Sequence, residues 1–319
     1  MRIRKLLRVR FVVDPFTEQE KIMAELTPMM QKYMETKEQY KDCILFYRLG
    51  DFYEMFFDDA LVASKELEIT LTGKSCGLEE RAPMCGIPYH AVEGYLSKLV
   101  SRGYKVAICE QVEDPKLAKG LVKREVIRVV TPGTNLNVQS LEAGKNNYLL
   151  SIAYTPDGIG ISAADVTTGD YYVTEVEDLK KLNDELMKYE PSEIICNEAF
   201  LVSGFDVNDL KSRLHISVNA LESHMFDDDG CRRILMKHFK VNTLIGLGVE
   251  EFPTGLLAAG ALLQYLYDTQ KTDLEHFTHI YPYLTSKYML LDSSTRRNLE
   301  LTETLREKQK RGSLLWGFG

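Results

Sequence analysis

The 319-residue sequence lacks an uninterrupted apolar run of the roughly 18–20 residues that a membrane-spanning helix requires. Its longest candidate, residues 255–267, is too short and predicts a packed helix instead. A cleaved signal is also missing, because charges interrupt the apolar part of residues 1–13 and no small-residue cleavage site follows. We therefore expect a cytoplasmic protein with no membrane partner.

Metal-binding cysteine pairs are missing too. The six cysteines form no CxxC motif, and their spacing does not combine with the six histidines into a zinc site. They are scattered singly at Cys43, Cys76, Cys85, Cys109, Cys196 and Cys231. We expect reduced thiols, as in a cytoplasm, and no metal.

The charge balance excludes a broadly basic surface. The chain has 39 Lys and Arg residues against 47 Asp and Glu residues, a net charge of −8. The acidic excess lies in residues 146–272, with 10 basic and 20 acidic side chains, whereas residues 23–145 have 16 and 18. A protein that coats nucleic acid nonspecifically is basic over a broad face. Any contact with DNA must therefore use local patches, and the acidic segment fits contacts with other domains or proteins better.

What is present is the composition of a folded globular chain, with 45% hydrophobic and 27% charged residues. This composition excludes a collagen-like, mucin-like or wholly disordered chain. The length predicts about two domains with hydrophobic cores.

The pattern of residues 23–131 predicts one α/β domain with a mixed sheet. Thr27, followed by proline, is suited to begin a helix. The apolar run 43–47 predicts a buried strand that leads through Gly50 into a helix over about 51–67. Then a strand, a loop or short strand, an amphipathic helix and two strands are expected at 69–73, 83–89, 90–102, 105–112 and 126–130. Strands that alternate with helices in this way indicate a compact α/β unit.

The following segment, residues 146–270, predicts a ribonuclease-H-like domain. Three short strands, a helix and a strand are expected at 147–154, 158–166, 170–176, 179–189 and 193–196. Turn sequences separate the three short strands, which predicts an antiparallel meander. A long helix is expected over 254–269, and an amphipathic helix over 293–310 is expected to begin an all-helical region.

A two-metal nuclease is the catalytic alternative that a ribonuclease-H-like fold raises. Such a site gathers carboxylates from the first strand, the first helix and the fourth strand. The first strand has none, and Asp165 and Asp170 lie in or beside the second and third. Gly73-Lys74-Ser75 is not the end of a P-loop either, because Glu68 stands where that motif needs glycine. The sequence therefore predicts no catalytic residues and no nucleotide or metal cofactor in this chain.

The most distinctive motif is LFYRLGDFYEMFFDDA at residues 45–60. An apolar strand leads into a glycine, and Asp51 is suited to cap the following helix, so that Phe52 falls in its first turn near the surface. The alternative is that Phe52, Phe56 and Phe57 all belong to the core. The pattern by itself favours this alternative.

A resemblance to a known family favours the exposed position of Phe52 instead. The segments that carry it are TPMMQKY, LFYRLGDFYEMFFDDA, LEITLTGK, APMCGIPYHAVEGYLSKLV, GYKVAICEQVEDPK, VKREVIRVVTPGT, DVTTGD, LLQYLYDTQK, LLDSSTRRNLEL and RGSLLW. From about Met23 to Trp316, the sequence resembles the N-terminal part of the MutS family of bacterial DNA mismatch-repair proteins. So many separate segments in the family's order argue against chance.

Two residues carry the family's recognition function by position. Phe52 matches the family's aromatic wedge, and Glu54 matches its partner carboxylate. The resemblance implies that Phe52 inserts beside the mispaired base in kinked duplex DNA and that Glu54 hydrogen-bonds the base. Lys74 and Arg81, near the expected loops, are candidates for contacts with DNA phosphates, with solvated surface as the equal alternative.

The resemblance also implies a domain organisation. Residues 23–131 would form the mismatch-recognition domain, 132–145 a linker and 146–270 the ribonuclease-H-like connector. Residues 271–319 would begin the helical core and lever domain. Residues 1–22 have no counterpart in the family and are expected to be an extension outside the fold. Because the family's clamp and ATPase come later in its sequence, we expect this chain to be a fragment.

Partners and activity follow from the same resemblance. The family binds mismatched double-stranded DNA and works with a MutL-type repair protein and a second MutS subunit. Its full-length members are DNA-dependent ATPases that use ATP and Mg, but the Walker site is absent from this chain, so we expect no enzyme activity of it. We expect the protein to associate with the nucleoid. Two alternatives stay open: a ribonuclease-H-like metal-dependent nuclease, and a non-catalytic interaction scaffold that does not distinguish mismatched from matched duplexes.

Overall fold

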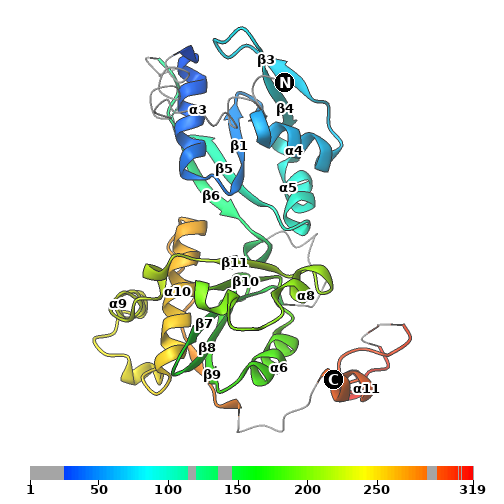
Figure 1. Cartoon of the computed structure of the whole chain (residues 1–319), viewed down its shortest axis with the longest axis vertical. Helices are drawn as coiled ribbons and strands as arrows, with labels where there is room; N and C mark the ends of the chain where they lie inside the picture. Colours follow the sequence, from blue (N-terminus) through cyan, green and yellow to red (C-terminus); the bar gives the residue numbers. More distant parts are fainter. Residues whose placement is uncertain are drawn as a thin grey trace. The chain divides into compact units, whose positions relative to one another are not determined.

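A computed structural model shows two compact units of mixed α/β structure, each built on its own six-stranded sheet (Figure 1). Among the described residues, the first unit comprises those within 25–99 and 106–127, and the second comprises those within 100–105 and 128–318. The structure describes residues 25–113, 120–135, 146–285, 293–307, 309 and 311–318. The predicted extension, residues 1–22, and residues 136–145 of the predicted linker lie outside these ranges. No helix within them is long and apolar enough to cross a membrane.

The strand with the aromatic motif lies inside the sheet of the first unit. The strands are β1 (Cys43–Leu49), β2 (Phe52–Phe56), β3 (Thr72–Lys74), β4 (Ala82–Pro88), β5 (Lys105–Gln111) and β6 (Arg124–Val130). Their order is β3-β4-β2-β1-β5-β6, and β2 pairs antiparallel with both β1 and β4. The helices are α3 (Pro28–Gln39), α4 (Phe57–Leu67) and α5 (Val92–Ser101), with the 3-10 helix η1 (Tyr89–Ala91) before α5.

The helix predicted after Gly50 is wrong at its start. A strand, β2, comes first, and α4 begins only at Phe57. Gly50 has a φ of +60°, and Leu49 lies opposite Phe52 in the ladder, so Gly50 and Asp51 form a two-residue hairpin turn. Glycine at the first central position is typical of such turns, because it adopts positive φ without steric cost. The turn therefore overrides the capping potential of Asp51.

Other predictions for this unit are confirmed with shifted bounds. α3 begins directly after Thr27, although the Thr27 side chain makes no capping hydrogen bond. The segment 83–89, predicted as a loop or short strand, is part of strand β4 except for its last residue. The strand predicted at 69–73 is displaced to β3. α5 ends shortly before Gly103, whose φ of +85° suits a helix stop.

The second unit confirms the predicted antiparallel meander. Its strands are β7 (Tyr148–Thr155), β8 (Gly158–Asp165), β9 (Asp170–Val176), β10 (Glu193–Cys196), β11 (Ser217–Ala220) and β12 (Tyr281–Pro282). Their order is β11-β10-β7-β8-β9-β12; β8 is antiparallel to β7 and β9, and β10 is parallel to β7 and β11. The main helices are α6 (Leu179–Tyr189), α7 (Glu198–Leu201), α8 (Val207–Ser212), α9 (Asp228–Phe239) and α10 (Pro253–Gln270).

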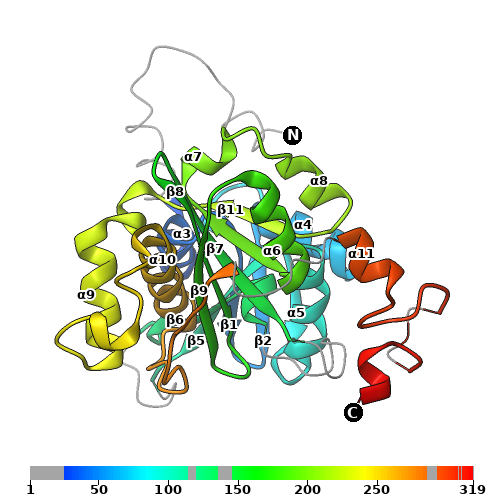
Figure 2. The ribbon, with the colours of Figure 1, turned by 90° about the horizontal axis from the view of Figure 1, so that it is seen from below.

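Helices cover both faces of this second sheet (Figure 2). On one face, α9 and α10 share a buried cluster with the sheet, and Leu149, Tyr171 and Leu262 all belong to it. On the other face, Leu150 belongs to a separate buried cluster with Leu186 of α6. The neighbours Leu149 and Leu150 thus serve opposite faces, as the two-residue period of a strand requires.

The described start of the predicted linker is part of the second unit. Residues Pro132–Thr134 form the 3-10 helix η2, and Gly133 and Thr134 are buried. A Cβ added at Gly133 would come within 3.0 Å of Leu149 and Glu193, so only glycine fits this close approach. The chain is therefore held against β7 and β10 at this point.

The amphipathic helix predicted over 293–310 is wrong beyond its beginning. α11 (Ser293–Asn298) ends just before Glu300, whose φ of +47° is incompatible with a right-handed helix. The chain then folds back on itself. Two backbone hydrogen bonds show this: the Leu314 N–H donates to the Glu300 carbonyl at 2.9 Å, and the Leu315 N–H donates to the Leu301 carbonyl at 3.0 Å. Backbone pairing of this turn replaces the helical hydrogen bonds.

Candidate nucleic-acid interface

The hairpin of β1 and β2 presents Phe52 at the surface. Phe52 is the first residue of β2, beside the two-residue turn, and pairs with Leu49 on one side and Pro88 on the other. The Tyr89 N–H donates to the Asp51 carbonyl at 3.0 Å, which ties the turn to the end of β4. Phe52 is 47% exposed, whereas the other aromatic rings of β2 are buried. The interpretation that Phe52 is a core residue is therefore wrong.

The opposite face of β2 anchors the hairpin. Tyr53 and Met55 are buried, as strand alternation requires. The Tyr53 hydroxyl donates to the Glu110 carboxylate on β5, and the Arg48 guanidinium pairs with the same carboxylate at 3.3 Å. Burial raises the pKa of Tyr53 well above its usual range, and the Glu110 carboxylate adds to this effect, so the phenol stays a hydrogen-bond donor. The exposed Phe52 thus extends from a fixed strand.

Arg48 and Tyr89 flank the same end of the hairpin, and the sequence interpretation missed both. The Arg48 guanidinium carbon lies 3.8 Å from the centroid of the Tyr89 ring, which is 43% exposed. The distance is that of a cation–π contact. The only sequence signal was their place in the two matched segments LFYRLG and GIPYH.

Glu54 lies two residues after Phe52, on the same face of β2, and the structure brings Lys74 to it. The Lys74 ammonium is 2.5 Å from Glu54 Oε2, with 16% of the Glu54 side chain and 34% of the Lys74 side chain exposed. Arg81 is exposed directly before β4, with its Cβ next to Gly73 of β3, and forms no ion pair with any residue that the structure describes. Of the two predicted phosphate contacts, one is thus paired within the protein.

The carboxylates of the second unit do not form a catalytic cluster. Asp165 is buried and accepts hydrogen bonds from Asn147 N–H at 3.0 Å and Thr167 N–H at 2.8 Å. Glu193 on β10 is fully buried and accepts from Tyr265 at 2.8 Å, among other donors. Within the described ranges, no group of three or more His, Cys, Asp or Glu side chains could hold a metal ion. The nuclease alternative therefore has no site in the described part of the chain.

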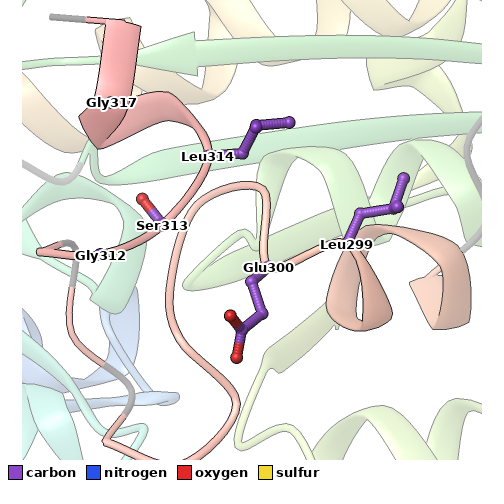
Figure 3. Close-up of a pocket in the computed structure, with 6 residues that line it drawn as sticks. All are labelled: Leu299, Glu300, Gly312, Ser313, Leu314 and Gly317. Atoms are coloured by element: carbon purple, nitrogen blue, oxygen red, sulfur yellow. The ribbon is translucent and has the colours of Figure 1, made fainter.

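One open pocket lies far along the chain, in the segment after α11 (Figure 3). It is lined by Leu299, Glu300, Gly312, Ser313, Leu314 and Gly317. Glu300 is the one ionisable group among these lining residues, and its carboxylate accepts a hydrogen bond from Leu305 N–H at 2.6 Å. This pocket offers a partner no convergent set of polar groups.

Comparisons with known proteins agree with the sequence pattern. Residues 27–139 match the family model described as MutS domain I, and residues 147–278 match the one described as MutS domain II. Proteins named DNA mismatch repair protein MutS are 69% identical over 294 residues in Lachnoclostridium phytofermentans and 54% identical over 297 residues in Ruminiclostridium cellulolyticum. A third, from Acetivibrio thermocellus, is 54% identical over 299 residues.

These matches identify the class of both units. The alignments cover 92% of this chain and 32–34% of each relative, so the chain spans about a third of the length of the curated relatives it matches. The two family models match consecutive parts of the chain, and the relatives of high identity carry the name of the same family. The chain belongs to the MutS family and carries its domains I and II.

Proposed function

We propose that this chain recognises mispaired bases in duplex DNA, as a part of DNA mismatch repair, with Phe52 inserted beside the mispair. The observation that carries the proposal is the position of Phe52: an apolar ring, 47% exposed, on a hairpin whose other face is locked into the core. The name shared by the relatives, DNA mismatch repair protein, supports the same function.

Insertion of an aromatic ring can distinguish a mispair without reading its sequence. Wedging an apolar side chain between base steps costs a few kcal/mol per step and kinks the duplex. A mispaired base is weakly held, so the deformation costs less there than in matched DNA. Stacking on the ring returns about 1–3 kcal/mol in either case. The difference in deformation energy supplies the preference for mismatched DNA and lets one ring serve many mispairs.

Glu54 would act beside the ring. An ionised carboxylate can only accept hydrogen bonds, so Glu54 can take one from the N–H of a displaced base. In matched DNA the base edges stay paired, and the carboxylate contributes mainly repulsion toward the phosphates. Glu54 would therefore raise the preference for mismatched DNA by disfavouring the matched duplex.

In this proposal, each other part of the chain has the role of the corresponding domain of the family. Residues 23–131 are the mismatch-recognition domain and 146–270 a ribonuclease-H-like connector, and residues 271–319 would lead into the family's helical core. The acidic connector would face other domains, a second MutS subunit or a MutL-type protein rather than DNA. ATP and Mg would act elsewhere in a longer protein, and the protein would associate with the nucleoid.

The proposal is tested by equilibrium binding of short duplexes, followed by fluorescence anisotropy. We expect the chain to bind a duplex with one G·T mispair more tightly than its matched counterpart. Replacing Phe52 with Ala should remove about 1–3 kcal/mol of binding, roughly five- to 150-fold in affinity, from the mismatched complex. Leu61→Ala is the matched control, because Leu61 is 38% exposed on α4 and outside the hairpin.

Two results would contradict the proposal. One is a Phe52→Ala variant that keeps the full mismatch preference. The other is equal affinity of the unaltered chain for both duplexes, which is the behaviour expected of an interaction scaffold. Cleavage of either duplex in the presence of a divalent metal would instead favour the nuclease alternative.

A further inference from the structure

We propose that Lys74 is a positioning residue for Glu54: it holds one carboxylate oxygen and offsets its charge, so that the acidic group can face DNA. This inference rests on the proposed function. It gives Lys74 a role other than the phosphate contact expected from the sequence. The two residues are 20 positions apart in the chain, and the Lys74 ammonium lies 2.5 Å from Glu54 Oε2.

Three neighbouring strands build this pair. Glu54 is on β2, Lys74 ends β3, and β4 runs between them with Gly86 opposite Glu54. A Cβ added at Gly86 would lie 3.6 Å from the Glu54 Cγ and 3.3 Å from the Tyr53 carbonyl oxygen. The Glu54 side chain therefore lies close over the glycine. The sheet leaves room for a side chain to cross from β2 toward β3 at this position.

The Lys74 ammonium has a second contact besides Glu54, and most of the side chain is covered. Its ammonium lies 5.6 Å from the ring centroid of Phe56, which is 1% exposed, and 66% of its side chain is covered, since 34% is exposed. A lysine that serves as a phosphate contact keeps its ammonium in solvent, where it can follow the backbone of the nucleic acid. Lys74 instead directs its charge at Glu54, and the described contacts of Glu54 use Oε2 and leave Oε1 for a base N–H.

Charge compensation explains how a carboxylate is tolerated at this surface. A bare Glu54 would repel the phosphates of every duplex, matched or mismatched. With Lys74 attached, this repulsion is reduced but not abolished, and the remaining oxygen can still accept a hydrogen bond from a displaced base. Lys74 therefore acts through Glu54, and its effect on DNA binding should depend on the presence of that carboxylate.

A double-mutant cycle tests this dependence. Lys74→Met, Glu54→Gln and the double variant are compared with the unaltered chain for binding to matched and G·T duplexes over a salt series. Lys74→Met should weaken binding to both duplexes by about tenfold where Glu54 is present and by less than about twofold in the Glu54→Gln background. Lys74→Arg keeps the charge and should restore binding.

The controls separate this role from other effects of the substitution. Lys32→Met breaks an ion pair of the same kind, Lys32–Glu35 at 2.6 Å on α3, and should leave DNA binding unchanged in both backgrounds. Thermal melting of each variant shows whether the fold is kept. If Lys74→Met fails to fold, Lys74→Gln, which removes the charge but keeps a polar end, takes its place in the cycle with the same expected losses in the two backgrounds.

The outcomes distinguish this inference from the proposed function. An equal loss on Lys74→Met in both backgrounds, with a salt slope reduced by about 0.9, would show a direct phosphate contact and overturn the inference. The cycle is also measured on the matched duplex. If the unaltered chain binds both duplexes equally well, the proposed function is contradicted, but the cycle still shows whether Lys74 acts through Glu54. A chain that binds no duplex at any salt concentration would overturn both.

Discussion

At the scale of single residues, charge placement decides what the surface of the first unit can bind. The whole chain is acidic, yet Arg48, Lys74 and Arg81 lie on or beside the strands that present Phe52. Arg48 forms an ion pair with Glu110 and a cation–π contact with Tyr89, and Lys74 forms an ion pair with Glu54. Arg81, which is exposed, is the cation of these three that is left to meet a phosphate.

Replacing Arg81 with Gln should weaken binding to matched and mismatched duplexes by the same factor. A lost phosphate contact carries no sequence information, and it reduces the slope of log affinity against log salt by about 0.9. Arg213→Gln is the control, because Arg213 is an exposed arginine of the second unit, paired with Asp209 at 2.7 Å. Unchanged salt slopes for the Arg81 variant would remove this residue from the interface.

A half-buried histidine makes the stability of the second unit depend on pH. His238 Nδ1 lies 2.7 Å from the Tyr267 hydroxyl and Nε2 lies 2.8 Å from the Phe277 carbonyl. Burial lowers the pKa of His238 below its ordinary value, and His276 and Lys240 add to this effect. The unfolded chain therefore binds a proton more readily than the folded chain. Stability should be lost as pH falls from about 6.5 toward the folded pKa.

The prediction is checked by the pH dependence of the urea midpoint between about pH 7 and pH 5. The unaltered chain should lose more stability over this range than the His238→Gln variant, whatever the two stabilities are at neutral pH. Parallel pH profiles for the two proteins would show that His238 does not carry the effect.

At the scale of elements, two helical glycines predict opposite effects of the same substitution. Gly260 of α10 touches α9 so closely that an added Cβ would lie 2.3 Å from the Cβ of Cys231. Gly94 of α5 has nothing within 4 Å of the same position. Gly94→Ala should stabilise by about 0.5–1 kcal/mol through helix propensity. Gly260→Ala should destabilise by about 1–3 kcal/mol, because two packed helices must separate.

Urea denaturation of the two variants measures this difference. The substitution is chemically identical, so helix propensity cancels in the comparison and the packing of α9 on α10 remains. A Gly260→Ala variant as stable as Gly94→Ala would mean that the two helices do not approach as closely as the structure has them.

The sequence predicted those elements whose period was unambiguous. The strands β7, β8 and β9 and the helix α6 were predicted because turn residues separate clear runs. The strand β2 was missed because five residues cannot separate a period of 2 from one of 3.6, and Asp51 resembled a helix cap. The ion pair of Glu54 with Lys74 could not be predicted from the sequence. It depends on the strand order β3-β4-β2, which places a residue 20 positions away beside Glu54.

At the scale of the whole molecule, the chain combines two units with different surfaces. Residues 146–272, most of the second unit, carry 10 basic and 20 acidic side chains, and residues 23–145 carry 16 and 18. An acidic unit is repelled by DNA, so the first unit is the one suited to approach a duplex. This division agrees with an interface limited to the hairpin of β1 and β2 and its surroundings.

In the proposed mode of binding, the Phe52 ring wedges into the duplex and bends it at the mispair. The most direct measurement is energy transfer between dyes at the two ends of a duplex that carries one G·T mispair. Binding of the unaltered chain should bring the ends closer, as expected for a kink of about 20–90°. The Phe52→Ala variant, at saturating concentration, should leave the duplex straight. An equal bend with both proteins would contradict the account.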